Sequence, residues 1–209
     1  MKSKGKFITF EGGEGSGKST QARMLYEFLR SKDISTILTR EPGGSEVAEE
    51  IRNVIVNGSA NKVDAHAEVL LLVAARRDHI LKRIQPALNL GQWVVCDRFI
   101  DSTFVYQGET KGVPMQLIQN LHDVFCFGIM PDKTVLCDVS VERGLERAKA
   151  RSSEEDRFEK NGFNFHKNVR EGFLSLSQLY PERYFVVNGE NSIENIHFHI
   201  ISELGLQDA

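Results

Sequence analysis

The sequence predicts an α/β fold in which a parallel sheet is flanked by helices. Two observations carry this prediction. Five short apolar runs, each bounded by turn residues, are separated by helix-length segments, an alternation typical of strand–helix–strand units. A glycine-rich turn also follows the first run directly. With 209 residues, 41% of them hydrophobic and 26% charged, the chain has the composition of one globular domain, which we expect to span residues 1–209.

The five apolar runs are the expected strands. They cover residues 7–10, 34–38, 93–96, 134–137 and 184–187. Between them, apolar residues recur at three-to-four spacing, which predicts helices with one face on the core. Two such stripes consist of Ala22, Leu25 and Leu29 and of Val47, Ile51, Val54 and Ile55.

A long helix is expected over residues 65–90, bent or ended near Pro86 because proline lacks the amide hydrogen that a helix interior needs. Ser45 and Ser192 are expected as helix N-caps, and Pro114 as the first residue of another helix. These assignments concern structure only.

The charge balance argues against a nucleic-acid partner. The chain has 26 basic and 29 acidic residues, a net charge of -3, which leaves no positive excess to hold a phosphate backbone. Cys96 and Cys137 lie inside apolar runs, and no C-x-x-C pair is present, which favours a reducing, cytoplasmic setting. The apolar run after the basic N-terminus stops at Phe10, too soon for a signal peptide or a membrane span.

The glycine-rich turn matches the P-loop pattern G-x-x-x-x-G-K-[ST] in the context that the pattern requires, between a strand and a helix. It consists of Gly12, Gly13, Glu14, Gly15, Ser16, Gly17, Lys18 and Ser19, and Thr20 follows in the helix. Backbone amides in such a loop converge on phosphates, the lysine reaches the β- and γ-phosphates, and the hydroxyl binds Mg²⁺. We therefore expect these nine residues to bind ATP, with Lys18 catalytic and Ser19 a metal ligand.

Two later strands end in an aspartate, Asp97 and Asp138, and either could help to hold the metal. We prefer Asp97, because Arg98 follows it at the carboxyl end of the strand, where open α/β sheets bind ligands. Asp138 is equally well explained as a turn residue before the next helix.

A P-loop alone does not distinguish an ATPase, a GTPase and a small-molecule kinase. Residues 61–64 have the N-K-x-D form associated with guanine recognition, but they precede the Asp97 strand and follow a polar turn, and the chain contains no D-x-x-G motif. An exposed loop between helices explains these residues better.

A kinase for a phosphorylated acceptor needs cations beyond the P-loop, because two anionic phosphates must approach each other. Arg40 follows the second expected strand and Arg98 the third, so both arginines project from the same edge as Lys18. A phosphate monoester, whose second pKa is about 6, is largely ionised at neutral pH, so the reaction needs no general base.

Further motifs occur in a fixed order. They are Arg40-Glu41-Pro42-Gly43-Gly44, Asp97-Arg98-Phe99 with Ser102-Thr103 and Tyr106-Gln107-Gly108, and Arg147 to Arg151 leading to Asp156-Arg157. In this order and spacing they resemble the bacterial thymidylate kinase family, from residue 7 to about residue 158. The resemblance implies a five-stranded parallel sheet wrapped by helices, transfer of the γ-phosphate of ATP to dTMP to give dTDP for dTTP synthesis, and a homodimer.

Site residues follow from the same resemblance, position by position. Arg40 and Arg98 would clamp the dTMP phosphate, with Arg98 also expected as a catalytic residue. Glu14 would accept a hydrogen bond from the sugar 3′-hydroxyl. Tyr106 would lie against the sugar. The residues expected around the thymine ring are Arg76, Thr103, Gln107 and Leu72, and the family usually has an aromatic residue where this chain has Leu72.

The catalytic cation is expected from a mobile lid at about residues 147–164, a segment rich in charge and without apolar periodicity. In this family a basic residue on the transferring phosphoryl group comes from the P-loop or from the lid. The variable P-loop positions hold no basic residue here, so the resemblance implies the lid-arginine subtype, with Arg147 and Arg151 as the catalytic candidates beside Lys149.

Two other functions stay open at this point. A kinase for another nucleotide or a deoxynucleoside would share the P-loop, but a deoxynucleoside kinase would need a carboxylate base for the 5′-hydroxyl. A nucleotide-dependent switch without an acceptor would hydrolyse ATP or GTP slowly and would not need Arg40 and Arg98.

Overall fold

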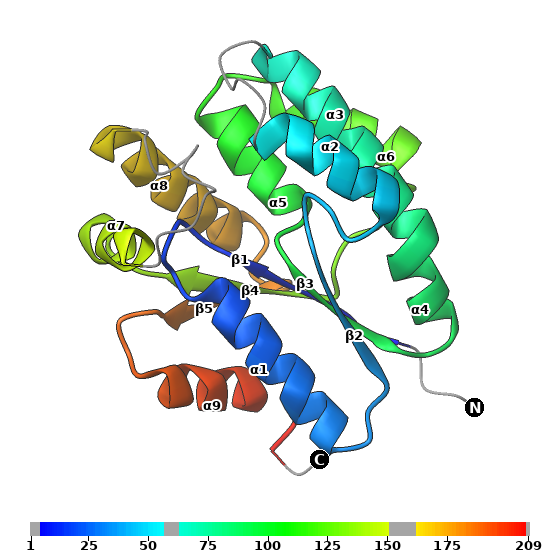
Figure 1. Ribbon diagram of the computed structural model, residues 1–209. Helices are drawn as coiled ribbons and strands as arrows, with labels where there is room; N and C mark the ends of the chain where they lie inside the picture. The colour runs from blue at the N-terminus through cyan, green and yellow to red at the C-terminus, as the bar shows by residue number, and fades with distance from the viewer. Residues whose placement is uncertain (1–4, 57–62, 151–161, 208–209) are drawn as a thin grey trace.

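The computed structural model describes residues 5–56, 63–150 and 162–207. Its centre is a five-stranded sheet with strand order β2-β3-β1-β4-β5 (Figure 1). The strands are β1 (Phe7–Glu11), β2 (Thr36–Arg40), β3 (Trp93–Asp97), β4 (Lys133–Asp138) and β5 (Tyr184–Asn188). All pairings are parallel, so the carboxyl ends of the strands share one edge. The predicted fold class is confirmed.

The second strand begins two residues later than predicted, at Thr36 in place of residue 34. Ile34 belongs to the turn after the first helix, where its amide donates to the carbonyl of Leu29 at 3.0 Å. Pairing starts only where Trp93 donates to the carbonyl of Ser35 at 2.8 Å. The hydrophobicity of Ile34 therefore reflects its packing on the core. It does not mark the residue at which hydrogen bonding between the strands begins.

Different helices cover the two faces of the sheet (Figure 1). Helices α1 (Lys18–Ser31) and α9 (Ile193–Glu203) pack with Ile8 and Phe10 of β1 in one apolar cluster. Phe7 belongs to a second cluster on the opposite face, with residues of α3, α6 and α8. The other helices are α2 (Glu46–Val56), α3 (Ala65–His79), α4 (Gln85–Asn89), α5 (Ile100–Thr103), α6 (Met115–Phe125), α7 (Val141–Lys149) and α8 (Phe163–Leu179).

The predicted long helix over residues 65–90 is present as three consecutive helical pieces. Between α3 and α4 lies a π-helical turn, Ile80–Ile84, in which the amide of Gln85 donates to the carbonyl of Ile80. Pro86 has no amide hydrogen to donate to the preceding turn, which explains why the hydrogen-bond pattern widens from α-helical to π-helical at this point. The helix does not end at Pro86 but continues to Asn89, and the change expected near Pro86 takes the form of this π-helical turn.

The predicted core stripe of α2 is wrong in part. Ile55 is buried, but Val47 and Val54 are 48% and 53% exposed. Because α2 packs mainly on α3, its inward face runs through Ala48 and Ile55. The stripe Ala22, Leu25 and Leu29 is fully buried, as predicted.

The three predicted helix starts have different outcomes. The hydroxyl of Ser192 accepts from the amide of Asn195 and caps α9, as predicted. Pro114 stands one position before α6 and not inside it. The hydroxyl of Ser45 donates to Asp78 at 2.7 Å, so this side chain ties α2 to α3. Within the described residues, no helix has both the length and the apolar character needed to cross a membrane.

Candidate active site

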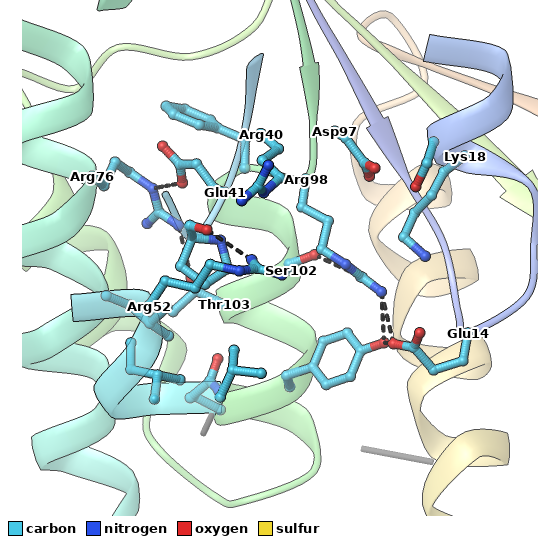
Figure 2. A pocket seen from close by; sticks show the side chains of 18 of the residues that line it. Glu14, Lys18, Arg40, Glu41, Arg52, Arg76, Asp97, Arg98, Ser102 and Thr103 are labelled. Carbon is cyan, nitrogen blue, oxygen red and sulfur yellow. Dashed lines mark hydrogen bonds and ion pairs between the residues drawn. The ribbon is translucent and has the colours of Figure 1, made fainter. Parts of the chain in front are cut away.

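A cavity of about 510 Å³ opens at the carboxyl edge of the sheet. Its walls come from the P-loop, the turn after β2, the facing sides of α2 and α3, and the segment that follows β3 (Figure 2). These parts of the chain are far apart in sequence but adjacent at this edge, as the parallel topology requires.

The P-loop adopts a conformation that requires glycine. Gly12 has φ +142°, and a Cβ there would lie 2.5 Å from the carbonyl of Cys137. Gly17 has φ +90° and directly precedes the first turn of α1. A loop of this kind turns backbone amides and the helix N-terminus toward one point, which suits an anion.

Lys18 begins α1 and lines the cavity, and its Nζ donates to the carbonyl of Gly13 at 3.0 Å. Only 7% of the residue is exposed. Burial and, next, the charge of Arg98 lower the pKa of Lys18, whereas Glu14 and Asp97 counteract this effect. The ammonium group therefore gains from any further negative charge that enters the cavity.

Ser19 and Asp97 lie where the sequence predicts a metal. Both line the cavity, Ser19 from the exposed first turn of α1 and Asp97 from the end of β3. The Oδ1 atom of Asp97 is buried and has no hydrogen-bond partner among the described residues. Asp138, the alternative, is engaged elsewhere, because Arg170 binds both of its oxygens at 2.6 and 2.8 Å.

Arg98 is held at both of its ends. Its backbone has φ +68°, a left-handed conformation that costs a residue with a side chain about 1–2 kcal/mol. Its guanidinium donates to Glu14 at 2.8 Å, to the hydroxyl of Tyr106 at 3.3 Å, and to the carbonyl of Gly12 and the hydroxyl of Ser102, both at 3.1 Å. The group also lies 5.1 Å from the centre of the Tyr106 ring.

Glu14 completes this cluster. Its carboxylate accepts from Arg98 and from the hydroxyl of Tyr106, the latter at 3.1 Å (Figure 2). Burial alone would raise the pKa of Glu14, but the charges of Lys18 and Arg98 outweigh it and lower that pKa to about 2. The sequence predicted Glu14, Arg98 and Tyr106 as neighbours around a nucleotide, and the structure brings the three together.

Arg76 reaches the other end of the cavity from α3. It is 2% exposed, and its guanidinium donates to Glu41 at 2.7 Å and to the hydroxyl of Thr103 at 3.0 Å. Oε1 of Glu41 also forms a hydrogen bond with Nδ1 of His79, at 2.9 Å. Burial tends to raise the pKa of Glu41, but Arg76 and His79 lower it overall, so this buried carboxyl stays ionised.

Leu72, Thr103 and Gln107 all line the cavity near Arg76, where the sequence predicts a base. Leu72 stands one helical turn before Arg76 and is 8% exposed. Gln107 belongs to the π-helical segment Phe104–Glu109 that continues α5. The residues predicted around the thymine ring therefore do share one wall.

Arg40 lies at the rim and not inside the cavity. Its side chain is 52% exposed and pairs with Glu49 at 3.0 Å, although it does contribute to the lining. Arg52, which the sequence analysis missed, also lines the cavity and donates to the carbonyl of Pro42 at 2.8 Å. The available signal was its spacing of three residues from Ile55, a member of the predicted apolar stripe, which puts the two side chains on neighbouring positions of one helix face.

The lid residues are only partly described. Arg147 lies in the last turn of α7 and donates to the carbonyl of Gly189 at 2.9 Å, and it is not among the described residues that line the cavity. Lys149 ends α7. Arg151 and Arg157 lie outside the described residues, as does most of the predicted segment 147–164.

Comparison with known proteins agrees with this geometry. The family model "Thymidylate kinase" matches residues 10–200. A thymidylate kinase from Ruegeria pomeroyi is 46% identical over 94% of this chain and 92% of its own length, and one from Dinoroseobacter shibae is 46% identical over 98% of both chains. The crystal structure of thymidylate kinase from Ehrlichia chaffeensis superposes with a TM-score of 0.78 at 35% identity, over 96% of this chain and 98% of that one. The chain therefore belongs to the thymidylate kinase family.

Proposed function

We propose that this protein transfers the γ-phosphoryl group of ATP to dTMP, releasing ADP and dTDP. One observation carries the proposal: Lys18 of the P-loop and Arg98 at the end of β3 line the same cavity. A cation for the donor phosphates and a cation for an acceptor phosphate thus face one space. A switch protein without an acceptor needs no cation to hold an acceptor phosphate.

The reaction needs positioning and charge more than acid–base chemistry. An oxygen of the acceptor phosphate forms a bond to the γ-phosphorus, the bond to the β,γ-bridging oxygen breaks, and ADP leaves with that electron pair. Lys18 would stabilise charge on the β- and γ-phosphates, and Arg98 would hold the acceptor in line. The acceptor is already ionised, so no side chain has to remove a proton.

Mg²⁺ fits the residues beside the P-loop. Ser19 offers a hydroxyl and Asp97 a carboxylate oxygen that lacks a partner among the described residues. Two protein ligands together with phosphate oxygens and waters are typical of Mg²⁺ in kinases. When bound there, the ion would neutralise charge on the donor phosphates, and Ser19 and Asp97 would fix its place.

The acceptor's sugar and base would lie along the wall from Glu14 to Arg76. Glu14, paired with Arg98 and Tyr106, can accept a hydrogen bond from a 3′-hydroxyl, and the Tyr106 ring lies beside it. Arg76 and Thr103 would meet the thymine edge, with Gln107 close by and Leu72 covering one face of the ring. Arg40 would turn from Glu49 toward the phosphate when the acceptor binds.

The lid would supply the remaining charge at the transferring phosphoryl group. The P-loop offers no basic residue apart from Lys18, so Arg151 or Arg147 would meet the developing charge on the γ-phosphoryl oxygens. Because Arg147 already donates to Gly189, Arg151 is the stronger candidate.

We also propose that the protein is a homodimer. Helix α2 packs on α3, and α3 packs on α6. The three helices carry exposed apolar side chains that include Val54, Leu70 and Val124. A second copy would cover this surface. Val73, on the same helix as Leu70, is buried within the chain and is not available.

Sedimentation of the purified protein tests the dimer. Wild-type protein is expected at twice the mass of one chain, and Leu70→Asp should shift it toward the monomer. A monomeric wild type would contradict the proposal.

The three cysteines are buried free thiols, which supports a reducing, cytoplasmic setting.

The catalytic proposal is tested by ADP release with a panel of acceptors. Purified protein with MgATP should release ADP rapidly with dTMP and slowly with dCMP, dAMP, thymidine or no acceptor. Mass spectrometry should identify dTDP as the product. If thymidine stimulates ADP release more than dTMP, or no acceptor does so, the proposed function is wrong.

A further inference from the structure

We propose that Glu11 is a positioning residue that holds the Asp97–Ser102 turn in the form that grips the acceptor phosphate. The inference rests on the proposed function, because it assigns Arg98 to the acceptor. Glu11 is the last residue of β1 and directly precedes the P-loop. It is fully buried and is not one of the residues that line the cavity.

Both oxygens of the Glu11 carboxyl bind the segment that follows β3. The amide of Phe99 donates to Oε1 at 2.7 Å, and the hydroxyl of Ser102 donates to Oε2 at 2.6 Å. Phe99 and Ser102 line the cavity, as does Arg98, which directly precedes Phe99. Glu11 thus reaches the cavity only through residues that form its wall.

The hydrogen bonds of Glu11 lie directly beside Arg98, a residue of this wall whose backbone is strained. Arg98 has φ +68°, and its own amide donates to the carbonyl of Phe10 at 2.9 Å. Oε1 of Glu11 takes the next amide, that of Phe99. The amides of Arg98 and Phe99 are therefore bound by the consecutive residues Phe10 and Glu11 of β1. These two hydrogen bonds together fix the left-handed turn at Arg98.

The same carboxyl also orients the head of the Arg98 side chain. The hydroxyl of Ser102 donates to Glu11 and accepts from Nη1 of Arg98 at 3.1 Å, so it stands between the two. Gly12, the residue after Glu11, accepts from the same Nη1 at 3.1 Å. Both ends of Arg98 are in this way tied to one short stretch of chain.

The contacts of Glu11 do not depend on its charge. Burial, reinforced by the neighbouring Asp101, raises the pKa of Glu11 to about 8, whereas Arg98 and the two hydrogen bonds act in the opposite direction. Asp101 is itself bound by Arg183 at 2.7 and 2.8 Å. With the carboxyl protonated, Oε1 can still accept from Phe99, and the acid proton can be donated to Ser102.

A neutral side chain of the same shape should therefore serve as well. In Glu11→Gln the amide oxygen can accept from Phe99 and the amide nitrogen can donate to Ser102. In Glu11→Ala both contacts are lost. Glu11→Asp keeps a carboxyl but is one methylene shorter, so it can reach only one of the two partners.

Steady-state kinetics of these variants test the proposal. We expect Glu11→Ala to raise the KM for dTMP about tenfold or more and to lower kcat, because Arg98 loses its fixed position, while the KM for ATP changes less than about threefold. Glu11→Gln should stay within about threefold of wild type for every constant. Glu11→Asp should fall between the two, and it carries the test if Glu11→Ala does not fold.

Asp132→Ala is the matched control. Asp132 accepts from the amide of Phe7 at 2.7 Å, at the opposite end of the same strand. This variant should lower the melting temperature without changing the KM for dTMP. The control thus shows whether a less stable protein by itself has a higher KM for dTMP, or whether the KM rises only when Arg98 loses its fixed position.

Three results would overturn the proposal. They are a folded Glu11→Ala or Glu11→Asp variant with wild-type constants for dTMP, an equal rise in the KM for ATP, and a Glu11→Gln variant as impaired as Glu11→Ala. If wild-type protein prefers another monophosphate, the proposed substrate is wrong, and the same comparison with that acceptor then decides the role of Glu11.

Discussion

The two halves of the cavity differ in how far they are built before any ligand binds. On the acceptor side, Arg98 and Arg76 are buried or nearly so, and each is fixed by a carboxylate from another part of the chain. On the donor side, Ser19 and Thr20 are exposed and Lys18 makes a single hydrogen bond to its own loop. With the proposed assignment, the acceptor side is preorganised, whereas ATP would complete the donor side.

Physical chemistry explains this difference. A guanidinium taken out of water needs paired, hydrogen-bonded partners, and those partners also fix its orientation. The P-loop is less constrained. Lys18 is also buried, but its Nζ donates to a carbonyl of its own loop, that of Gly13. Phosphates would add the further partners that Lys18 and the loop amides can bind. In the proposed mode of binding, a rigid wall would recognise the small acceptor, and the highly charged donor would order the residues around it.

The largest expected effect lies on the donor side. Lys18→Ala should reduce phosphoryl transfer by about a thousandfold or more, because it removes the cation of the β- and γ-phosphates. Since burial lowers the pKa of Lys18, its removal should not lower the melting temperature. Turnover is measured by ADP release and unfolding by circular dichroism. Wild-type turnover in this variant would contradict the assignment of the donor site.

The next effect concerns the lid. Arg151→Ala should lower kcat by at least about tenfold, or 1.4 kcal/mol, with little change in the KM for dTMP, because the side chain would act on charge that develops in the transition state. Arg147→Ala serves as the comparison, since Arg147 donates to Gly189. If neither variant changes kcat tenfold, the catalytic cation lies elsewhere.

Local sequence predicted most of the donor side and only the outline of the acceptor side. The P-loop and Asp97 follow from motifs that span a few residues, and on the acceptor side so does Arg98. Glu41 stands 35 residues from Arg76, and Glu11 stands 88 residues from Phe99. Pairings at such separations depend on strand order and helix packing, which a motif does not encode.

The errors have the same origin. Periodicity identified α2 as a helix but assigned Val47 and Val54 to the core, because an exposed apolar stripe and a buried one have the same spacing. The left-handed turn at Arg98 had no local signal, since arginine rarely adopts positive φ. The contacts of Glu11 enforce that turn, and they are visible only in the fold.

The smallest expected effect probes the base end of the acceptor wall. Leu72 lines the cavity one turn before Arg76, so Leu72→Phe should stack on the base and lower the KM for dTMP several-fold, by about 1 kcal/mol, with little change in kcat. The melting temperature of the same variant is the control. A destabilised protein with an unchanged KM would place Leu72 away from the nucleotide.

Calorimetric titration of dTMP into the ligand-free protein, without ATP or Mg²⁺, tests the preorganised acceptor wall most directly. Arg98, Glu14, Tyr106 and Arg76 are already held by one another and by Glu41. The account predicts saturable binding with one site per chain and a Kd within about tenfold of the KM for dTMP. Absence of binding until ATP or a nonhydrolysable analogue is added would show that the donor builds the acceptor site, and would contradict the account.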